Sequence, residues 1–167
     1  MEYSGPYIYS LELSGAKNGR YISAKLYEGQ LSNFQKPVTK NKTPKVYILK
    51  HEGKIVYVGY ASQSIGTRLG QGVRNFGKKY GYKWSILDEV ELYIIVFDKE
   101  LKGSERGKRN DADLPFIEFA EAVEAELVYL VKEKTGFWPA FQNEIHFNNE
   151  DNEKVKIVAE EIYEKVD

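Results

Sequence analysis

Residues 46–68 read VYILKHEGKIVYVGYASQSIGTR, and this stretch decides the fold prediction. Two short apolar runs, 46–49 and 55–58, flank a polar segment that ends in glycine. Such a pattern is typical of a β-hairpin. Ser62 or Ser64 then opens a predicted helix. The stretch therefore predicts two paired antiparallel strands followed by a helix.

Four residues of this stretch form a candidate phosphate site. Tyr47 and Tyr57 stand on the two paired strands, and Gly59 follows two residues after the second tyrosine. Arg68 lies on the predicted helix, where a guanidinium can bind phosphate oxygens with its planar set of donors. Two tyrosines, a glycine and an arginine at these spacings are typical of a site that binds phosphate.

Charge is strongly segregated along the chain, although the formal net charge is only −1. Residues 36–83 contain eleven Lys and Arg side chains and a single acid, Glu52, whereas residues 84–167 contain twenty-one acids and ten bases. A basic block around a candidate phosphate site favours a polyanionic partner over a merely solvated surface.

Length and composition indicate one soluble globular domain. The chain has 167 residues, which is enough to bury a substantial core, and its apolar content of 42% is ordinary. It has no cysteine and two histidines, so disulfides are excluded and a closed structural zinc site is disfavoured. No segment is typical of a signal peptide or a membrane span, and a cytoplasmic location is expected.

The N-terminal region, residues 1–44, is predicted to be a β arm and linker outside the core. Residues 7–13 and 20–26 alternate between apolar and polar side chains and predict a second hairpin. The linker, 37–44, is rich in lysine and turn formers.

The core of the domain is predicted to span residues 45–147. Its helix after the hairpin is expected to end near Phe76, and residues 90–97 predict a third strand. A polar loop is expected over 99–110. The expected fold is α+β, a three-stranded antiparallel sheet flanked by helices, with an amphipathic C-terminal helix over 150–166 within the segment 148–167.

The clearest helix begins at residues 113–115 and ends before Gly136. Its predicted apolar stripe consists of Phe116, Phe119, Ala120, Val123, Leu127, Leu130 and Val131. At about 100° per residue, Glu126 lies closest to that stripe, with Glu133 slightly further out and Glu124 pointing away. Glu126 is then either a surface glutamate whose stem covers apolar area or a metal ligand.

With these features in view, the chain resembles the GIY-YIG nucleases over residues 45–143. Val46-Tyr47-Ile48 stands at the first tyrosine motif of the family, and Tyr57-Val58-Gly59 is similar to the second. Arg68 matches the family arginine, and Glu126 and Asn143 match its glutamate and closing asparagine. Residues 81–84 and 138–147 resemble the small bacterial restriction-endonuclease branch.

The resemblance implies a metal-dependent endonuclease that hydrolyses double-stranded DNA, a site-specific restriction-type enzyme able to act as a homodimer. It implies that Glu126 holds Mg²⁺, with Mn²⁺ as a substitute, and that Arg68 clamps the phosphate. Tyr47 would act as general base with help from Tyr57, and Asn143 would orient the site. Glu124 and Glu133 remain alternative ligands, and His146 is assigned to packing.

The expected DNA-contacting residues are basic side chains of the 36–83 block together with one glycine: Lys54, Gly59, Arg74, Lys78, Lys79 and Lys83. The chain departs from the family pattern where Lys45 replaces the first glycine, where Gly72 stands one turn after Arg68 in place of a histidine, and where one extra residue lies between Gly59 and Arg68. These departures leave open a catalytically silent DNA-binding module, a phage or repair nuclease of loose specificity, and an ordinary interaction domain.

Overall fold

The structure is a computed structural model that describes residues 1–79, 81–143, 145 and 152–167. The predicted hairpin is confirmed: β4 (Lys45–His51) pairs antiparallel with β5 (Lys54–Ala61), and Tyr47 lies opposite Gly59. Glu52 and Gly53 connect them with φ angles of 51° and 77°. Two successive positive φ values are the geometry of a type I′ turn, which suits a two-residue hairpin.

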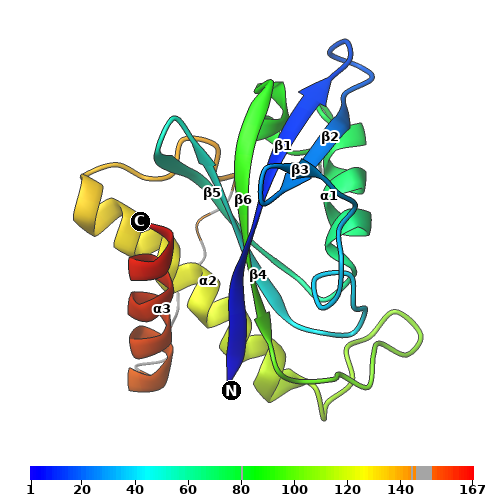
Figure 1. Ribbon diagram of the computed structural model, residues 1–167. Helices are drawn as coiled ribbons and strands as arrows, with labels where there is room; N and C mark the ends of the chain where they lie inside the picture. The colour runs from blue at the N-terminus through cyan, green and yellow to red at the C-terminus, as the bar shows by residue number, and fades with distance from the viewer. Residues whose placement is uncertain (80, 144, 146–151) are drawn as a thin grey trace.

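The sheet has six antiparallel strands in the order β3-β2-β1-β6-β4-β5, so the expected three-stranded sheet was too small (Figure 1). The expected third strand is β6 (Glu89–Phe97), which pairs with β4. Its other edge pairs with β1 (Tyr3–Ser14), and β2 (Tyr21–Tyr27) and β3 (Gln30–Leu31) extend the sheet further.

The expectation of an N-terminal arm outside the core is wrong. Tyr9, Leu11 and Leu13 are buried on alternate positions of β1. Without β1, one edge of β6 would leave its backbone donors and acceptors without partners. β1 provides those partners by pairing with β6. The N-terminal hairpin is therefore part of the main sheet.

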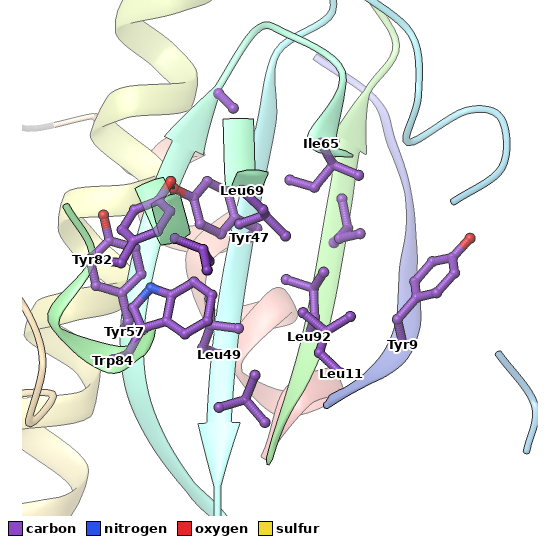
Figure 2. Packing of buried hydrophobic residues seen from close by; sticks show 14 of the residues in the cluster. Tyr9, Leu11, Tyr47, Leu49, Tyr57, Ile65, Leu69, Tyr82, Trp84 and Leu92 are labelled. Atoms are coloured by element: carbon purple, nitrogen blue, oxygen red, sulfur yellow. The ribbon is translucent and has the colours of Figure 1, made fainter. Parts of the chain in front are cut away.

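Helices cover both faces of the sheet (Figure 1). One face carries α1 (Ile65–Arg74) and the short 3₁₀ helix η1 (Lys83–Ile86), and the other carries α2 (Leu114–Thr135) and α3 (Glu153–Val166). The hydrophobic core between the sheet and α1 contains Tyr47 and Tyr57. Figure 2 shows these two tyrosines gathered there with Tyr82 and Trp84.

Helix boundaries agree with the sequence prediction wherever they are described. α1 begins after Ser64 and its C-cap is Asn75, and α2 ends at Gly136 with a φ of 85°. The predicted start of the C-terminal helix at Glu150 lies outside the described residues. Within the described ranges, no helix is long and apolar enough to cross a membrane.

Candidate active site

Tyr47 is fully buried and lies against Gly59, its partner on the neighbouring strand of the hairpin. Its ring extends over Gly59, where an added Cβ would come within 2.5 Å of the phenolic oxygen. The glycine of the second motif is therefore required by the position of the tyrosine of the first. Because Gly59 is itself buried, its role in the structure is to make room for Tyr47, and the expected DNA contact is not needed to explain it.

Tyr47, Tyr57 and Arg68 come together as the sequence predicts. The rings of Tyr47 and Tyr57 are 6.0 Å apart between centroids. Arg68 extends from α1 and places its guanidinium carbon 5.1 Å from the ring centroid of a third tyrosine, Tyr82. The Tyr47 and Tyr82 hydroxyl oxygens are 2.6 Å apart. The sequence prediction missed Tyr82 as a member of the site.

The phenols of this cluster are held neutral by their surroundings. Burial raises the pKa of Tyr57 above its ordinary value, and the neighbouring Tyr82 raises it further, while Arg68 opposes the shift. Burial likewise raises the pKa of Tyr47 well above its ordinary value. A phenol in this cluster therefore ionises only when a cation balances the charge.

Glu124, and not Glu126, is the glutamate of α2 that reaches the tyrosines. Its carboxylate raises the pKa values of Tyr57, Tyr82 and Arg68, so it lies within electrostatic range of all three. Glu126 is half-buried, as Glu124 is, and Glu133 is exposed, but among the described residues neither Glu126 nor Glu133 affects the pKa values of the three tyrosines.

The helical period of the sequence favours Glu126 only if α2 has one buried side, whereas α2 is buried on two sides. α2 contacts both β5 and α3, and its buried residues include Ile117, Val128 and Val131. At about 100° per residue, Glu124 lies within roughly 20° of both Ile117 and Val131, and roughly 40° from Val128. Glu124 therefore lies on the same side of α2 as these buried residues.

The environment of Glu124 suits a cation ligand. Burial and, to a smaller extent, the neighbouring Glu121 raise the pKa of its carboxyl, while Arg68 opposes the shift, and the result is a pKa of about 8. In the described part of the chain no hydrogen bond or ion pair to Glu124 occurs, whereas Glu121 is paired with Arg109 at 2.8 Å. A desolvated carboxylate without a partner is unfavourable unless a cation joins it.

Lys45, the first residue of β4, has a structural role. Its Nζ donates to the backbone carbonyls of Lys40, Thr43 and Gln63 at 2.6, 2.9 and 2.9 Å. Burial lowers the pKa of this amine to about 8. All three donors are used on carbonyls, so Lys45 ties the linker to the loop before α1 and does not stabilise a phenolate.

The amide that meets the tyrosine hairpin belongs to Gln142 and not to Asn143. Gln142 Nε2 donates to the Val58 carbonyl at 2.9 Å, and the Val58 amide donates to Gln142 Oε1 at 3.0 Å. This side chain mimics one more strand residue on the free edge of β5. Asn143 is exposed, and the predicted packing residue His146 lies outside the described residues.

The basic side chains divide into an exposed group and a buried pair. Arg74, Lys78, Lys79 and Lys83 are exposed at the end of α1 and in the segment that follows it. Lys54 is exposed at the hairpin turn, five residues from Gly59, which is about 16 Å along an extended strand. Lys45 and Lys50 are buried, with Lys50 donating to the Val166 carbonyl at 2.8 Å.

Comparisons with known proteins give no independent family assignment: no family model, curated protein or solved structure matches this chain. The site geometry therefore carries the functional argument by itself.

Proposed function

We propose that this protein is a metal-dependent endonuclease of the GIY-YIG type that hydrolyses phosphodiester bonds of double-stranded DNA. One observation carries the proposal: Tyr47, Tyr57 and Arg68 converge, and the half-buried Glu124, which has no hydrogen bond or ion pair among the described residues, lies within electrostatic range of them. This set combines phosphate recognition, an anionic ligand for a cation and phenols that exchange protons.

The residues present fit a hard divalent cation such as Mg²⁺ or Mn²⁺. Glu124 would hold it in place of the expected Glu126, because its desolvated carboxylate faces Arg68 and the tyrosines. No cluster of three His, Cys, Asp or Glu side chains exists in the described ranges. A cation that keeps most of its waters and shares phosphate oxygens requires only one or two protein carboxylates. When bound, Mg²⁺ would supply neutralisation of the charge that develops on the phosphate.

The other residues divide the remaining tasks of phosphate hydrolysis. Arg68 would bind the scissile phosphate with two parallel donors, since its guanidinium makes no hydrogen bond among the described residues and is held only over the Tyr82 ring. Tyr57, the more exposed of the two motif tyrosines at 8% against 0% for Tyr47, is the phenol nearer to a substrate. Tyr47 lies behind it and would tune its ionisation.

Duplex DNA is the proposed substrate because the exposed basic residues lie beside the site. Arg74, Lys78, Lys79 and Lys83 are exposed at the end of α1 and in the segment that follows it, and Lys83 directly follows Tyr82. Phosphate contacts of this kind position a duplex without selecting its sequence. A restriction-type specificity and a homodimer that cuts both strands are part of the proposal.

The test is incubation of supercoiled plasmid with the purified protein in Mg²⁺ and, in parallel, in EDTA. The proposal expects nicked and linear products only with the metal. Plasmid that shifts in a gel but stays intact with Mg²⁺ and with Mn²⁺ would identify a DNA-binding module in place of a nuclease.

A further inference from the structure

Gly72 leaves a space on α1 that a tyrosine from another segment fills. It lies four residues after Arg68, one turn along the same face of the helix. A Cβ at Gly72 would come within 2.0 Å of the Tyr82 ring, so any other residue there would displace that ring. The position where α1 would project its own side chain toward Tyr47 is therefore occupied by Tyr82.

The backbone around Tyr82 is held in place from several directions. Its amide donates to the Gly72 carbonyl at 3.0 Å, and its own carbonyl accepts from the Ser85 hydroxyl. The preceding Gly81 is pressed against Asn75, since a Cβ would lie 1.8 Å from the Asn75 carbonyl oxygen. The ring stacks on Trp84 at 5.0 Å between centroids. Tyr82 is thus fixed to α1 in one orientation.

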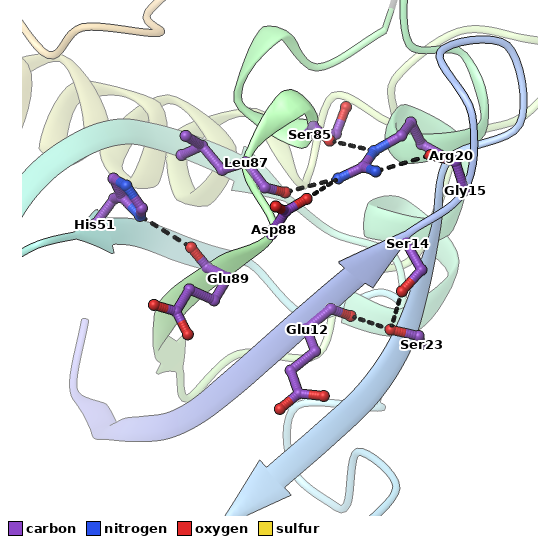
Figure 3. A network of polar contacts seen from close by, with 10 residues as sticks. All are labelled: Glu12, Ser14, Gly15, Arg20, Ser23, His51, Ser85, Leu87, Asp88 and Glu89. Carbon is purple, nitrogen blue, oxygen red and sulfur yellow. Dashed lines mark hydrogen bonds and ion pairs between the residues drawn. The ribbon is translucent and has the colours of Figure 1, made fainter.

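The β1–β2 hairpin adds a second anchor for the segment that carries Tyr82. Arg20 donates to the Ser85 and Leu87 carbonyls at 2.8 and 2.9 Å and meets the Asp88 carboxylate at 3.4 Å (Figure 3). These bonds hold η1 against the N-terminal strands. The hydrogen bonds from Arg20 therefore fix the segment after Tyr82 more firmly than packing of the Tyr82 ring alone would require.

Tyr82 contacts both the hydroxyl of Tyr47 and the guanidinium of Arg68. Its hydroxyl lies 2.6 Å from that of Tyr47, and Arg68 lies over its ring. We propose that Tyr82 is a third tyrosine of the site, a positioning residue that replaces a side chain at Gly72, shares a proton with Tyr47 and carries the negative charge of the pair. Its effect on cleavage rests on the proposed nuclease function, whereas its ionisation does not.

The geometry explains why the charge sits on Tyr82. When one proton leaves the pair, the remaining proton stays on Tyr47, whose O–H donates to the Tyr82 phenolate, and Arg68 balances that charge. Burial raises the pKa of both phenols, but Arg68 and the hydrogen bond from Tyr47 lower the pKa of Tyr82. The Glu124 carboxylate opposes ionisation of Tyr82. Neutralising Glu124 should therefore ease it.

The experiment places 3-fluorotyrosine at position 82 or at position 47 and follows the ¹⁹F chemical shift with pH, without DNA or metal. The label at 82 should titrate at a lower pH than the label at 47. Arg68→Gln should move the midpoint at 82 upward by more than the midpoint at 47. Tyr82→Phe should lower the midpoint of labelled Tyr47, because the charge that forms first is then absent. A label at Tyr21, which is 53% exposed, serves as the control for an ordinary phenol.

Three results would overturn the proposal: Tyr47 titrating first, a Tyr47 midpoint unchanged by Tyr82→Phe, or equal shifts of both midpoints in Arg68→Gln. Cleavage supplies the second readout. Tyr82→Phe keeps the ring and should lower single-turnover cleavage and flatten its rise with pH, while DNA affinity stays the same. If the wild-type protein does not cut DNA, the proposed function fails but the titration still decides the role of Tyr82.

Discussion

The phenol of Tyr47 lies directly over Gly59, so closely that a Cβ on Gly59 would fall 2.4 Å from the ring carbon Cζ. This contact connects the two tyrosine motifs more tightly than their spacing in the sequence suggests. It also fixes the direction in which Tyr47 points, because the glycine is the one residue that leaves the space open.

Gly59→Ala should therefore destabilise the protein and misplace Tyr47. Overpacking of a tight core contact costs about 1–3 kcal/mol, and we expect a loss of that size in urea unfolding. Gly70→Ala is the matched control, because nothing lies within 4 Å of a Cβ there. That half-buried helical substitution should stabilise by about 0.5–1 kcal/mol. Equal stabilities for both variants would show that the Tyr47 ring can move aside without cost.

Glu124→Gln should stabilise the protein at high pH and have little effect at low pH. The carboxyl ionises near pH 4.5 in the unfolded chain but only at about 8 in the fold. Between these values the folded state binds more protons, so wild-type stability falls as pH rises, whereas the glutamine variant escapes this loss. Melting temperatures at pH 5 and pH 9 measure the difference.

Added Mg²⁺ extends that test without any need for cleavage. At pH 9 the ion should raise the melting temperature of the wild-type protein, because it binds the folded state through Glu124. Mg²⁺ should leave the melting temperature of the Glu124→Gln variant unchanged. The same rise in both proteins would place the metal somewhere else.

Arg68→Lys should lose most of the cleavage rate while keeping DNA affinity. Lysine keeps the positive charge but lacks the planar pair of donors. A missing transition-state donor typically costs about 10²–10³ in rate. Arg74→Lys is the same change at an exposed position of α1 and should cut normally. Single-turnover rates and fluorescence anisotropy separate the two effects, and a fully active Arg68→Lys would mean that only a point charge is needed.

DNA binding should weaken steeply with salt. Two of the eleven basic residues of the 36–83 block, Lys45 and Lys50, are buried and bonded within the fold. If four to seven of the others contact phosphate, log K should fall with log salt at a slope of roughly −4 to −6 per subunit. Anisotropy of the wild-type protein in EDTA measures the slope.

A matched pair of charge reversals locates the binding surface. Lys78→Glu should flatten the salt dependence, whereas Lys154→Glu at the start of α3 should not, although both side chains are exposed. A slope near zero, or equal losses from both variants, would mean that the basic block is only a solvated surface.

The sequence predicted the local parts of this site well. The hairpin, the first turn of α1 and the positions of Tyr47, Tyr57 and Arg68 depend on strand alternation and helix start signals, which act over a few residues. The strand at 90–97 and the long helix follow from the same kind of pattern.

Contacts between distant segments could not be predicted in the same way. Helical periodicity favours Glu126 over the alternative Glu124 only if α2 has a single apolar stripe, whereas α2 packs against both β5 and α3. Tyr82 reaches Tyr47 across 35 residues, and the signal was present only indirectly, in the glycines at 72 and 81 that its position requires. The N-terminal strands join through β6, a pairing that alternation alone does not specify.

The most direct measurement compares plasmid cleavage by the wild-type protein, Glu124→Gln and Glu126→Gln at pH 8.5 with Mg²⁺. Both substitutions remove one charge from α2 and preserve side-chain shape, so they differ in position alone. We predict that the wild-type protein and Glu126→Gln cut at similar rates, and that Glu124→Gln is slower by at least ~100-fold. A Glu124→Gln protein that cuts as fast as the wild type, or cleavage that persists in EDTA, would contradict a metal-dependent site built around Glu124.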